Sequence, residues 1–140
     1  MPEPCPICAK HRGNGPLTSL EVWSDDLVVV SHGAEPGFFG YLFVETRRHV
    51  ACLDALTGPE ALAVGRAAWL AARALRAELD AESLHSAVTG RTVPHFHQHV
   101  FVRHRGTPPE AGWMDVALPS APHDERVDLC GRLRPHFDRP

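Results

Sequence analysis

The sequence lacks long apolar runs and has little net charge, and each shortage excludes a class of protein. No uninterrupted apolar stretch approaches the ~20 residues of a membrane-spanning helix. The first sixteen residues lack the apolar core of a signal peptide. We therefore expect a cytoplasmic protein with no membrane partner. The net charge of −3 provides no broad basic face, so we expect no nucleic-acid partner either.

Cysteines are also few, and four of them in a reducing compartment do not suggest a disulfide framework. Cys5 and Cys8 form a C-x-x-C pair, which in that setting points to metal binding or redox use. A thioredoxin-like role is one alternative, although no βαβ pattern surrounds the pair, and plain buried thiols are another. The pair supplies half of a zinc site. We expect Cys130 to lie in the core and Cys52 to be a spare thiol.

The composition is typical of one globular domain, which we expect to span residues 1–140. Of the 140 residues, 44% are hydrophobic and 22% are charged, so the chain can bury a core. No internal repeat or low-complexity linker divides it. Residues 1–16 are rich in proline, glycine and cysteine, and we expect an irregular segment there unless something holds it. Residues 106–140 should form a loop and a C-terminal helix.

Apolar runs separated by turn residues predict about five strands. The first two surround a turn at Asp25 and Asp26. The third contains GFFGYLFVE and should be buried, and the last contains the strand formers Val100, Phe101 and Val102. The predicted strands are residues 20–23, 27–32, 37–45, 84–90 and 96–103.

One long helix and one short helix complete the pattern. Thr57 and Glu60 have the spacing of a capping box, and apolar residues then recur at helical spacing over residues 59–80. A shorter helix is predicted at residues 124–134, where Pro135 should end it. Strands, a long helix and further strands predict an α+β fold, with an antiparallel sheet and the long helix packed on it.

Residues 95–101 read HFHQHVF, with histidines at 95, 97 and 99. Alternate side chains of a strand share a face, so this spacing places three imidazoles in one row. Near neutral pH an imidazole can be a nucleophile, an acid, a base or a metal ligand. Surface histidines on an edge strand are the plain alternative. A transition-metal site is another, although the nearby sequence offers no carboxylate as a further ligand.

The stretch GRTVPHFHQHVFVR, residues 90–103, resembles the signature of the histidine triad (HIT) superfamily, in which three histidines alternate with mostly apolar residues. YLFVETRRHV at residues 41–50, the long helix and the early CPIC resemble other segments of the family in the same order. The resemblance covers most of the chain from Cys5 to Arg105. It implies a HIT-like antiparallel sheet and chemistry at the α-phosphate of a nucleotide. Dinucleoside polyphosphates and nucleoside phosphoramidates are the candidate substrates.

By this resemblance His97 is the nucleophile, which attacks the α-phosphorus and forms a nucleotidyl-histidine intermediate. His99 would donate hydrogen bonds to the charge that develops on the phosphate and the leaving group. We expect His95 to complete the catalytic set. Phosphorylase relatives carry Gln in place of the third histidine, so His99 favours hydrolysis. The candidate substrate contacts are Ser86, Gln98 and Arg103.

The resemblance also implies a structural zinc. In zinc-carrying branches of the superfamily, two N-terminal cysteines join the histidine after the third strand and the first histidine of the triad. The matching ligands here are Cys5, Cys8, His49 and His95. A Cys2His2 set is closed and tetrahedral, so its role is structural, and the reaction requires no catalytic metal. Many relatives dimerise, and we expect a homodimer formed through the long helix.

The chain departs from the family pattern at several positions. Gln98 replaces an apolar residue and should face away from the histidines, where a buried amide needs partners. Tyr41 takes a position that is His in the Hint branch, and Thr46 one that is often Pro. Residues 84–90 lack a supporting Asn, for which Ser86 partly substitutes. No acidic residue suited to the ribose hydroxyls is evident in residues 28–37. These departures leave the nucleoside specificity open.

The hypothesis is therefore a nucleotide hydrolase or nucleotidyl transferase of the bacterial zinc-containing HIT branch. Two alternatives stay open. A catalytically weak, zinc-stabilised nucleotide-binding module would bind nucleotide without releasing product. A metal-dependent hydrolase with a catalytic ion on His95, His97 and His99 would lose its activity to chelators and regain it with added metal.

Overall fold

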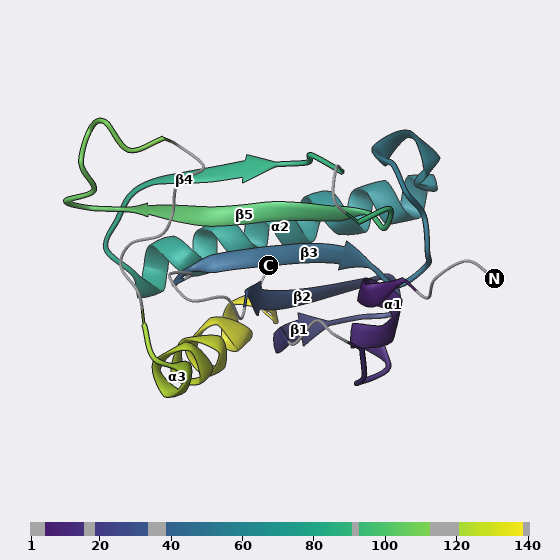
Figure 1. The fold of residues 1–140 in the computed structure, drawn as a ribbon, viewed down its shortest axis with the longest axis horizontal. Helices are drawn as coiled ribbons and strands as arrows, with labels where there is room; N and C mark the ends of the chain where they lie inside the picture. The colour runs from purple at the N-terminus through teal and green to yellow at the C-terminus, as the bar shows by residue number, and fades with distance from the viewer. Residues whose placement is uncertain (1–4, 16–18, 34–38, 91–92, 113–120, 139–140) are drawn as a thin grey trace.

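Five antiparallel strands form one sheet, and the longest helix packs across one of its faces (Figure 1). The computed structural model describes residues 5–15, 19–33, 39–90, 93–112 and 121–138. The architecture confirms the predicted α+β fold. In chain order the elements are α1 (Pro6–His11), β1 (Ser19–Ser24), β2 (Val28–Gly33), β3 (Tyr41–Thr46), the 3-10 turn η1 (Leu53–Ala55), α2 (Gly58–Glu78), β4 (Ala81–Ala87), β5 (His97–His104), α3 (His123–Leu133) and the 3-10 turn η2 (Arg134–Phe137).

The strand order places the histidine-bearing strand inside the sheet. The order is β1-β2-β3-β5-β4, so β5 lies between β3 and β4 and is antiparallel to both. Helix α2 connects β3 to β4 and passes behind the sheet in Figure 1. A central strand has hydrogen-bonding neighbours on both sides, which holds its side chains in fixed positions. The edge of the sheet next to β5 is formed by β4.

The two faces of the sheet differ in chemistry, because residues paired directly across neighbouring strands point the same way. On one face, Leu42 and Val44 of β3 and Val100 and Val102 of β5 are buried in the core against α2. The opposite face is called here the imidazole face. On β3 and β5 it consists of Tyr41, Phe43 and Glu45 with His97, His99 and Phe101.

The start of α2 carries the predicted capping box. The Thr57 hydroxyl accepts a hydrogen bond from the Glu60 amide, and the Glu60 carboxylate accepts one from the Thr57 amide. Arg48 also donates to both carboxylate oxygens of Glu60, at 3.0 and 2.7 Å. These hydrogen bonds from Arg48 and Thr57 lower the pKa of Glu60 to about 2. Through Arg48, the Glu60 carboxylate of the capping box joins the start of α2 to the segment that follows β3.

Strand boundaries differ from the prediction by a few residues. Strand β4 begins at Ala81 rather than Leu84, because Ala81 and Ser83 still pair with β5. It ends before Gly90, whose φ of +62° leaves the extended conformation. Strand β5 begins one residue later than predicted, and β3 begins at Tyr41. Residues 37–38 of the predicted third strand lie outside the described residues.

The N-terminal segment is predicted to be irregular unless something holds it, and Pro6–His11 are held and form α1. Proline in the first turn suits a helix start, but no side chain caps this helix. Its side chains Lys10 and His11 instead bind Glu45 of β3, which holds the helix against the sheet. Figure 1 shows α1 beside one end of β2 and β3.

The C-terminal helix forms where predicted, but Pro135 does not end the helical path. Helix α3 runs from His123 to Leu133, and the chain continues as the 3-10 turn η2, which includes Pro135. Phe137 at its end is buried and stacks on Trp23 of β1 with ring centroids 5.4 Å apart. Cys130 is buried, as predicted. Within the described ranges, no helix combines the length and apolar character that crossing a bilayer requires.

Candidate functional site

Two of the three histidines lie on the regular part of β5 and share the imidazole face. The ring centroids of His97 and His99 are 5.3 Å apart. The Phe43 ring of β3 contacts both, with centroids 6.3 Å from His97 and 5.2 Å from His99. The alternation in the sequence predicts this shared face for these two residues. His95 precedes the strand, and both of its ring nitrogens bind other groups.

His97 is held in one tautomer by the backbone. Its Nδ1 lies 2.7 Å from the carbonyl oxygen of His95, which can only accept, so Nδ1 carries the proton. In a neutral imidazole the other nitrogen, Nε2, then has a free lone pair. The side chain is only 7% exposed. The geometry therefore presents one nucleophilic nitrogen on the imidazole face.

His99 is held by Tyr41 of the neighbouring strand. The Tyr41 hydroxyl lies 2.6 Å from Nδ1 of His99. The Nε2 atom of His99 is buried and has no hydrogen-bond partner among the described residues. Burial and the neighbouring His97 lower the pKa of His99 to about 4, so its ring is neutral at neutral pH.

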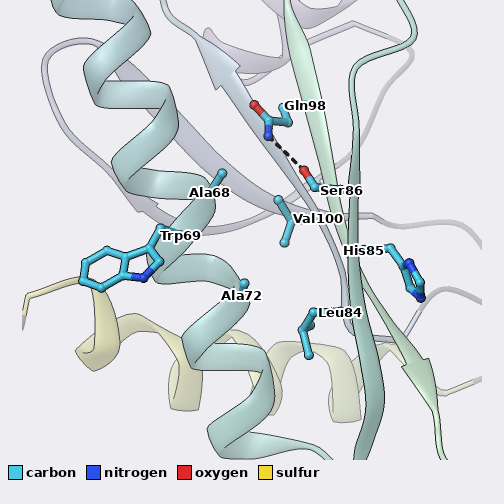
Figure 2. A pocket seen from close by; sticks show the side chains of 8 residues that line it. All are labelled: Ala68, Trp69, Ala72, Leu84, His85, Ser86, Gln98 and Val100. Atoms are coloured by element: carbon cyan, nitrogen blue, oxygen red, sulfur yellow. Dashed lines mark hydrogen bonds between the residues drawn. The ribbon is translucent and has the colours of Figure 1, made fainter.

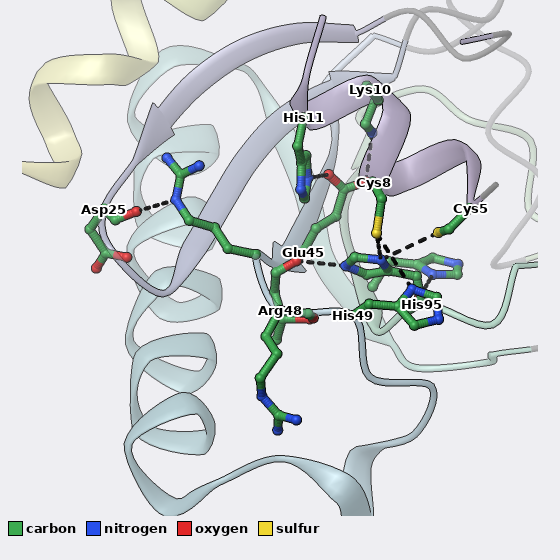
Figure 3. Close-up of polar contacts among 12 residues, drawn as sticks. Cys5, Cys8, Lys10, His11, Asp25, Glu45, Arg48, His49 and His95 are labelled. Atoms are coloured by element: carbon green, nitrogen blue, oxygen red, sulfur yellow. Dashed lines mark hydrogen bonds and ion pairs between the residues drawn. The ribbon is translucent and has the colours of Figure 1, made fainter. Parts of the chain in front are cut away.

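Four further side chains converge at the end of the sheet nearest α1 (Figure 3). Cys5 precedes α1, Cys8 lies in α1, His49 follows β3 and His95 precedes β5. One donor atom from each of the four lies within 4.8 Å of all the others. The structure therefore brings together all four residues predicted as metal ligands. Cys52 is exposed and does not belong to this group within the part of the chain that the structure describes.

Three of the distances between donor atoms match the spacing of a tetrahedral zinc site. The Nδ1 atom of His95 lies 3.4 Å from the sulfur of Cys5 and 3.4 Å from that of Cys8. Nδ1 of His49 lies 3.5 Å from the Cys8 sulfur. Zinc–sulfur and zinc–nitrogen bonds of usual length, at the tetrahedral angle, separate the ligand atoms by about 3.5 Å. The residues present therefore fit a zinc ion.

Hydrogen bonding around His95 supports the same assignment. Its Nε2 donates to the carbonyl of Thr46 at 2.6 Å, which leaves the Nδ1 lone pair directed at the two sulfurs. Burial and the adjacent Cys5 raise the pKa of Cys8, so a bound cation would be needed to stabilise the thiolate. Since both nitrogens of His95 are committed here, His95 cannot share an ion with His97 and His99.

A buried carboxylate connects α1 to the imidazole face. Glu45 lies directly across from His97 in the β3–β5 pairing and is 1% exposed. Lys10 and His11 contact its two oxygens at 2.6 and 2.9 Å. Burial acts to raise the pKa of Glu45, but these two partners outweigh it and hold the pKa below its ordinary value. Helix α1, which carries Cys8, is thus also fixed to the strand next to His97.

Two of the predicted substrate contacts, Ser86 and Gln98, lie on the α2 side of the sheet (Figure 2). Their side chains hydrogen-bond to each other at 2.8 Å, and Ser86 also donates to the carbonyl of His99. This hydrogen bond gives the amide nitrogen of Gln98 a partner, and the side chain faces away from the imidazoles as predicted. The third candidate, Arg103, binds Glu82 and two backbone carbonyls of residues 108–111, which commits its guanidinium to that loop.

Sequence reasoning missed three groups on the imidazole face. The sequence pattern identifies Tyr41 only as a departure from the family, and it assigns no role to Ser31 or Glu45. Ser31 of β2 is fully buried, pairs with Phe43, and has a hydroxyl without a partner among the described residues. The odd-numbered positions of β3 offered a signal, because Tyr41 and Glu45 alternate with apolar residues that pack on α2.

The HIT domain family model matches residues 15–106 of the chain. This range includes β1 to β5, α2, and the two histidines of the candidate metal site, but not Cys5 and Cys8. No curated protein sequence matches the chain significantly.

Solved structures of histidine triad proteins resemble the fold over most of its length. A zinc-bound histidine triad family protein from Mycobacterium smegmatis superposes with a TM-score of 0.74 at 21% identity, over 96% of this chain and 94% of that one. A hypothetical histidine triad nucleotide-binding protein from Sulfolobus tokodaii gives 0.76 at 14% identity, over 96% and 92%. A HIT family member from Bacillus subtilis gives 0.66 at 25% identity, over 74% and 76%.

Proposed function

The chain belongs to the HIT domain family, and from that premise we propose that it acts at the α-phosphate of a nucleoside phosphate, as a nucleotide hydrolase or nucleotidyl transferase. The proposed substrates are dinucleoside polyphosphates or nucleoside phosphoramidates, which carry a leaving group on the α-phosphate. The observation that carries the proposal is the hydrogen bond from Nδ1 of His97 to the carbonyl of His95. It leaves Nε2 as a nucleophile beside a second imidazole, that of His99.

In the first step, the Nε2 lone pair of His97 attacks the α-phosphorus. The bond from phosphorus to the leaving group breaks, and the leaving group departs with that electron pair and gains a proton. The product is a nucleotidyl group bound through phosphorus to Nε2. In the second step, a water oxygen attacks the same phosphorus, the N–P bond breaks, and its electrons return to Nε2. The water loses one proton, and the nucleoside monophosphate is released.

The proposed role of His99 is to donate a hydrogen bond to the charge that develops on the phosphate or the leaving group. Its ring lies beside that of His97, and its Nε2 has no partner within the described ranges. His95 would contribute through its backbone carbonyl rather than through its ring, whose nitrogens bind Thr46 and the cysteine cluster.

We also propose that zinc binds at Cys5, Cys8, His49 and His95. Supporting this are the donor spacing and the similarity to the zinc-bound protein from Mycobacterium smegmatis. The ion would supply no step of the reaction, because its four ligands are protein side chains and close the site. It would fix the position of His95, whose carbonyl orients His97. A cytoplasmic location is part of the proposal, since a reducing compartment keeps both cysteines available as ligands.

The binding-module alternative predicts nucleotide binding without product. The metal-dependent alternative has little support, because His95 is turned toward the cysteines and the third ligand is then missing. It predicts that chelation abolishes the reaction at once. In the proposed mechanism, folded protein keeps its turnover during brief chelation.

The decisive experiment is intact-mass spectrometry of the protein after brief incubation with adenosine phosphoramidate or diadenosine tetraphosphate. The reaction is quenched without acid, because the N–P bond is acid-labile, and AMP release is followed in parallel. Wild type should carry a nucleotidyl adduct. His97→Ala should lose the adduct and at least about 1,000-fold in turnover, as expected for loss of a covalent nucleophile.

The matched control is His136→Ala, which removes a histidine of η2 whose Nε2 lies 3.7 Å from a carboxylate oxygen of Glu78. This variant should keep both adduct and turnover. Wild type that binds nucleotide without adduct or product would establish the binding module instead. Turnover that persists in His97→Ala would exclude His97 as the nucleophile.

We further propose a homodimer formed through α2 and β4. Strand β4 is an edge strand, and next to it lies a pocket of about 250 Å³ between α2, β4 and β5 (Figure 2). Trp69 of α2 lines the pocket and is 50% exposed. Light scattering after size-exclusion chromatography should give twice the monomer mass. Trp69→Glu should give a monomer, and Val127→Glu, at an exposed position of α3 outside the proposed interface, should not. A monomeric wild type would refute the proposal.

A further inference from the structure

The hydroxyl of Tyr41 is fixed in place against His99. The Tyr41 ring is 4% exposed and stacks on Phe101, with centroids 4.9 Å apart and planes within 7°. It also meets the His99 ring edge to face, at 5.6 Å and 86°. The phenol therefore cannot rotate away, and its oxygen stays 2.6 Å from Nδ1 of His99.

Two arrangements of protons are compatible with that distance. Either the phenol donates to Nδ1, and the proton of the neutral imidazole is on Nε2, or Nδ1 donates to the phenol oxygen and Nε2 is bare. The choice decides what His99 offers on the imidazole face. A protonated Nε2 donates a hydrogen bond, whereas a bare Nε2 can only accept one.

Relative acidity favours the first arrangement. A phenol O–H is a far stronger donor than the N–H of a neutral imidazole, and an imidazole nitrogen is a stronger acceptor than a phenol oxygen. Burial raises the pKa of Tyr41 to about 12, so the phenol keeps its proton at neutral pH. Burial likewise keeps the His99 ring neutral. The short contact is then an O–H···N hydrogen bond, and the proton of His99 is on Nε2.

We propose that Tyr41 is a positioning residue that holds His99 in the tautomer with its proton on Nε2. The neighbouring His97 is held by the His95 carbonyl in the tautomer with a bare Nε2. The two imidazoles, with centroids 5.3 Å apart, therefore present opposite chemistry on one face. His97 offers a lone pair and His99 offers a proton. The catalytic use of this arrangement rests on the proposed function, but the tautomer itself does not.

The experiment is long-range 1H–15N NMR of the zinc-loaded protein labelled with 15N-histidine, at neutral pH and without substrate. Protonated and bare ring nitrogens resonate far apart, so each tautomer is read directly. His97→Ala and His99→Ala assign the two rings. Wild type should show the Nε2–H tautomer for His99 and the Nδ1–H tautomer for His97.

The test variant is Tyr41→Phe, which keeps the stacked ring and removes only the hydroxyl. His99 should then change to a mixture of tautomers. With diadenosine tetraphosphate, kcat should fall about 10- to 100-fold. This is the loss typical of removing a residue that orients a metal-binding side chain, and Tyr41 orients His99 in a comparable way. KM should stay nearly constant. The stability control is Leu129→Ala in the core packing of α3, which should lower the melting temperature and leave the tautomer of His99 unchanged.

An Nδ1–H tautomer of His99 in wild type overturns the proposal, and so does an unchanged tautomer in Tyr41→Phe. Normal kcat in Tyr41→Phe overturns its catalytic part. If wild type turns over no nucleotide but the spectra behave as expected, only the proposed function fails, and the role of Tyr41 in fixing His99 stands.

Discussion

At the residue scale, the imidazole face contains polar atoms that the described part of the fold leaves without partners. The hydroxyl of Ser31 and Nε2 of His99 are both buried and lack hydrogen bonds among the described residues. They lie in one row across the sheet, since Ser31 pairs with Phe43 and Phe43 pairs with His99. A buried polar group without a hydrogen bond costs about 1–3 kcal/mol of stability. A fold keeps such destabilising atoms when they serve another purpose, such as binding a ligand.

Ser31→Ala should therefore raise the free energy of unfolding by about 1 kcal/mol, because it removes an unsatisfied hydroxyl. Urea denaturation would measure the change. The matched control is Ser86→Ala, since the Ser86 hydroxyl accepts from Gln98 and donates to the carbonyl of His99. That variant should lose about 1 kcal/mol. Equal destabilisation by the two substitutions would mean that Ser31 has a partner after all.

His32 makes stability depend on pH. Its side chain is fully buried, donates from Nδ1 to the Gly33 carbonyl and accepts at Nε2 from the Gly40 amide. Burial lowers its pKa to about 4, against 6.5 for the exposed side chain. As the pH falls from about 6.5 to 4, the unfolded chain takes up this proton before the folded chain does, so stability declines across that window.

The decline attributable to His32 should be on the order of 3 kcal/mol. Chemical denaturation of wild type and His32→Asn between pH 7 and pH 4 would measure it, because the difference between the two proteins removes the contribution of other groups. The wild type should lose stability more steeply. Parallel curves would show that the folded state accepts the proton on His32.

At the element scale, α2 is the segment whose local sequence decides its structure most clearly. The capping box forms as the spacing of Thr57 and Glu60 predicts, and the helix begins within one residue of the predicted start. Buried Val64, Ala71 and Leu75 follow at helical spacing. Arg66, Arg73 and Arg76 are exposed. A helix with such local signals can be predicted from its own sequence, without knowing what packs against it.

Thr57→Ala should lower the free energy of unfolding by about 1 kcal/mol, because it deletes the side-chain acceptor at the helix start. Thermal or urea denaturation would measure the loss. Arg66→Ala, an exposed change within the same helix, should stay within about 0.5 kcal/mol of wild type. An effect of Thr57→Ala as small as that of the control would show that Arg48 and Glu60 alone maintain the helix start.

Other elements depend on distant partners and were harder to predict. Helix α1 has six residues and no side-chain cap, and a helix that short is not stable alone. Its contacts with Glu45 join positions 34 and 35 residues apart. The hydrogen bond between the side chains of Tyr41 and His99 joins residues 58 positions apart and depends on the register of β3 against β5. The spacing of the histidines placed His97 and His99 on one face, but it contained no information about what lies across from them.

At the scale of the whole molecule, the candidate zinc site connects three distant parts of the chain. It joins α1 to the segments that follow β3 and precede β5, over separations of 41 to 90 residues. The resemblance predicted this ligand set residue by residue. What it did not predict is that α1 is also held by a buried carboxylate, because Glu45 has no part in the histidine signature.

Removing zinc should destabilise the folded protein. A ligand present at 100 times its dissociation constant stabilises the native state by about 2.7 kcal/mol, and the chelated protein should lose at least that much. Cys8→Ser should contain less than one zinc per chain and melt at a lower temperature, as measured by elemental analysis and calorimetry. Cys52→Ser is the control, since Cys52 is exposed and outside the cluster. Equal metal loss in both variants would refute the assignment.

The position of β5 in the sheet has a consequence for how the protein is made. Among the described strands it is the last to be synthesised, yet its place is between β3 and β4, which precede it in the chain. Those two strands are not neighbours until β5 inserts between them. Until then, a nascent chain lacks the histidines of residues 95–99, and β3 and β4 each have a strand edge without its native partner, which is prone to misassociation. The late arrival of β5 makes completion of the sheet and assembly of the candidate site the same event.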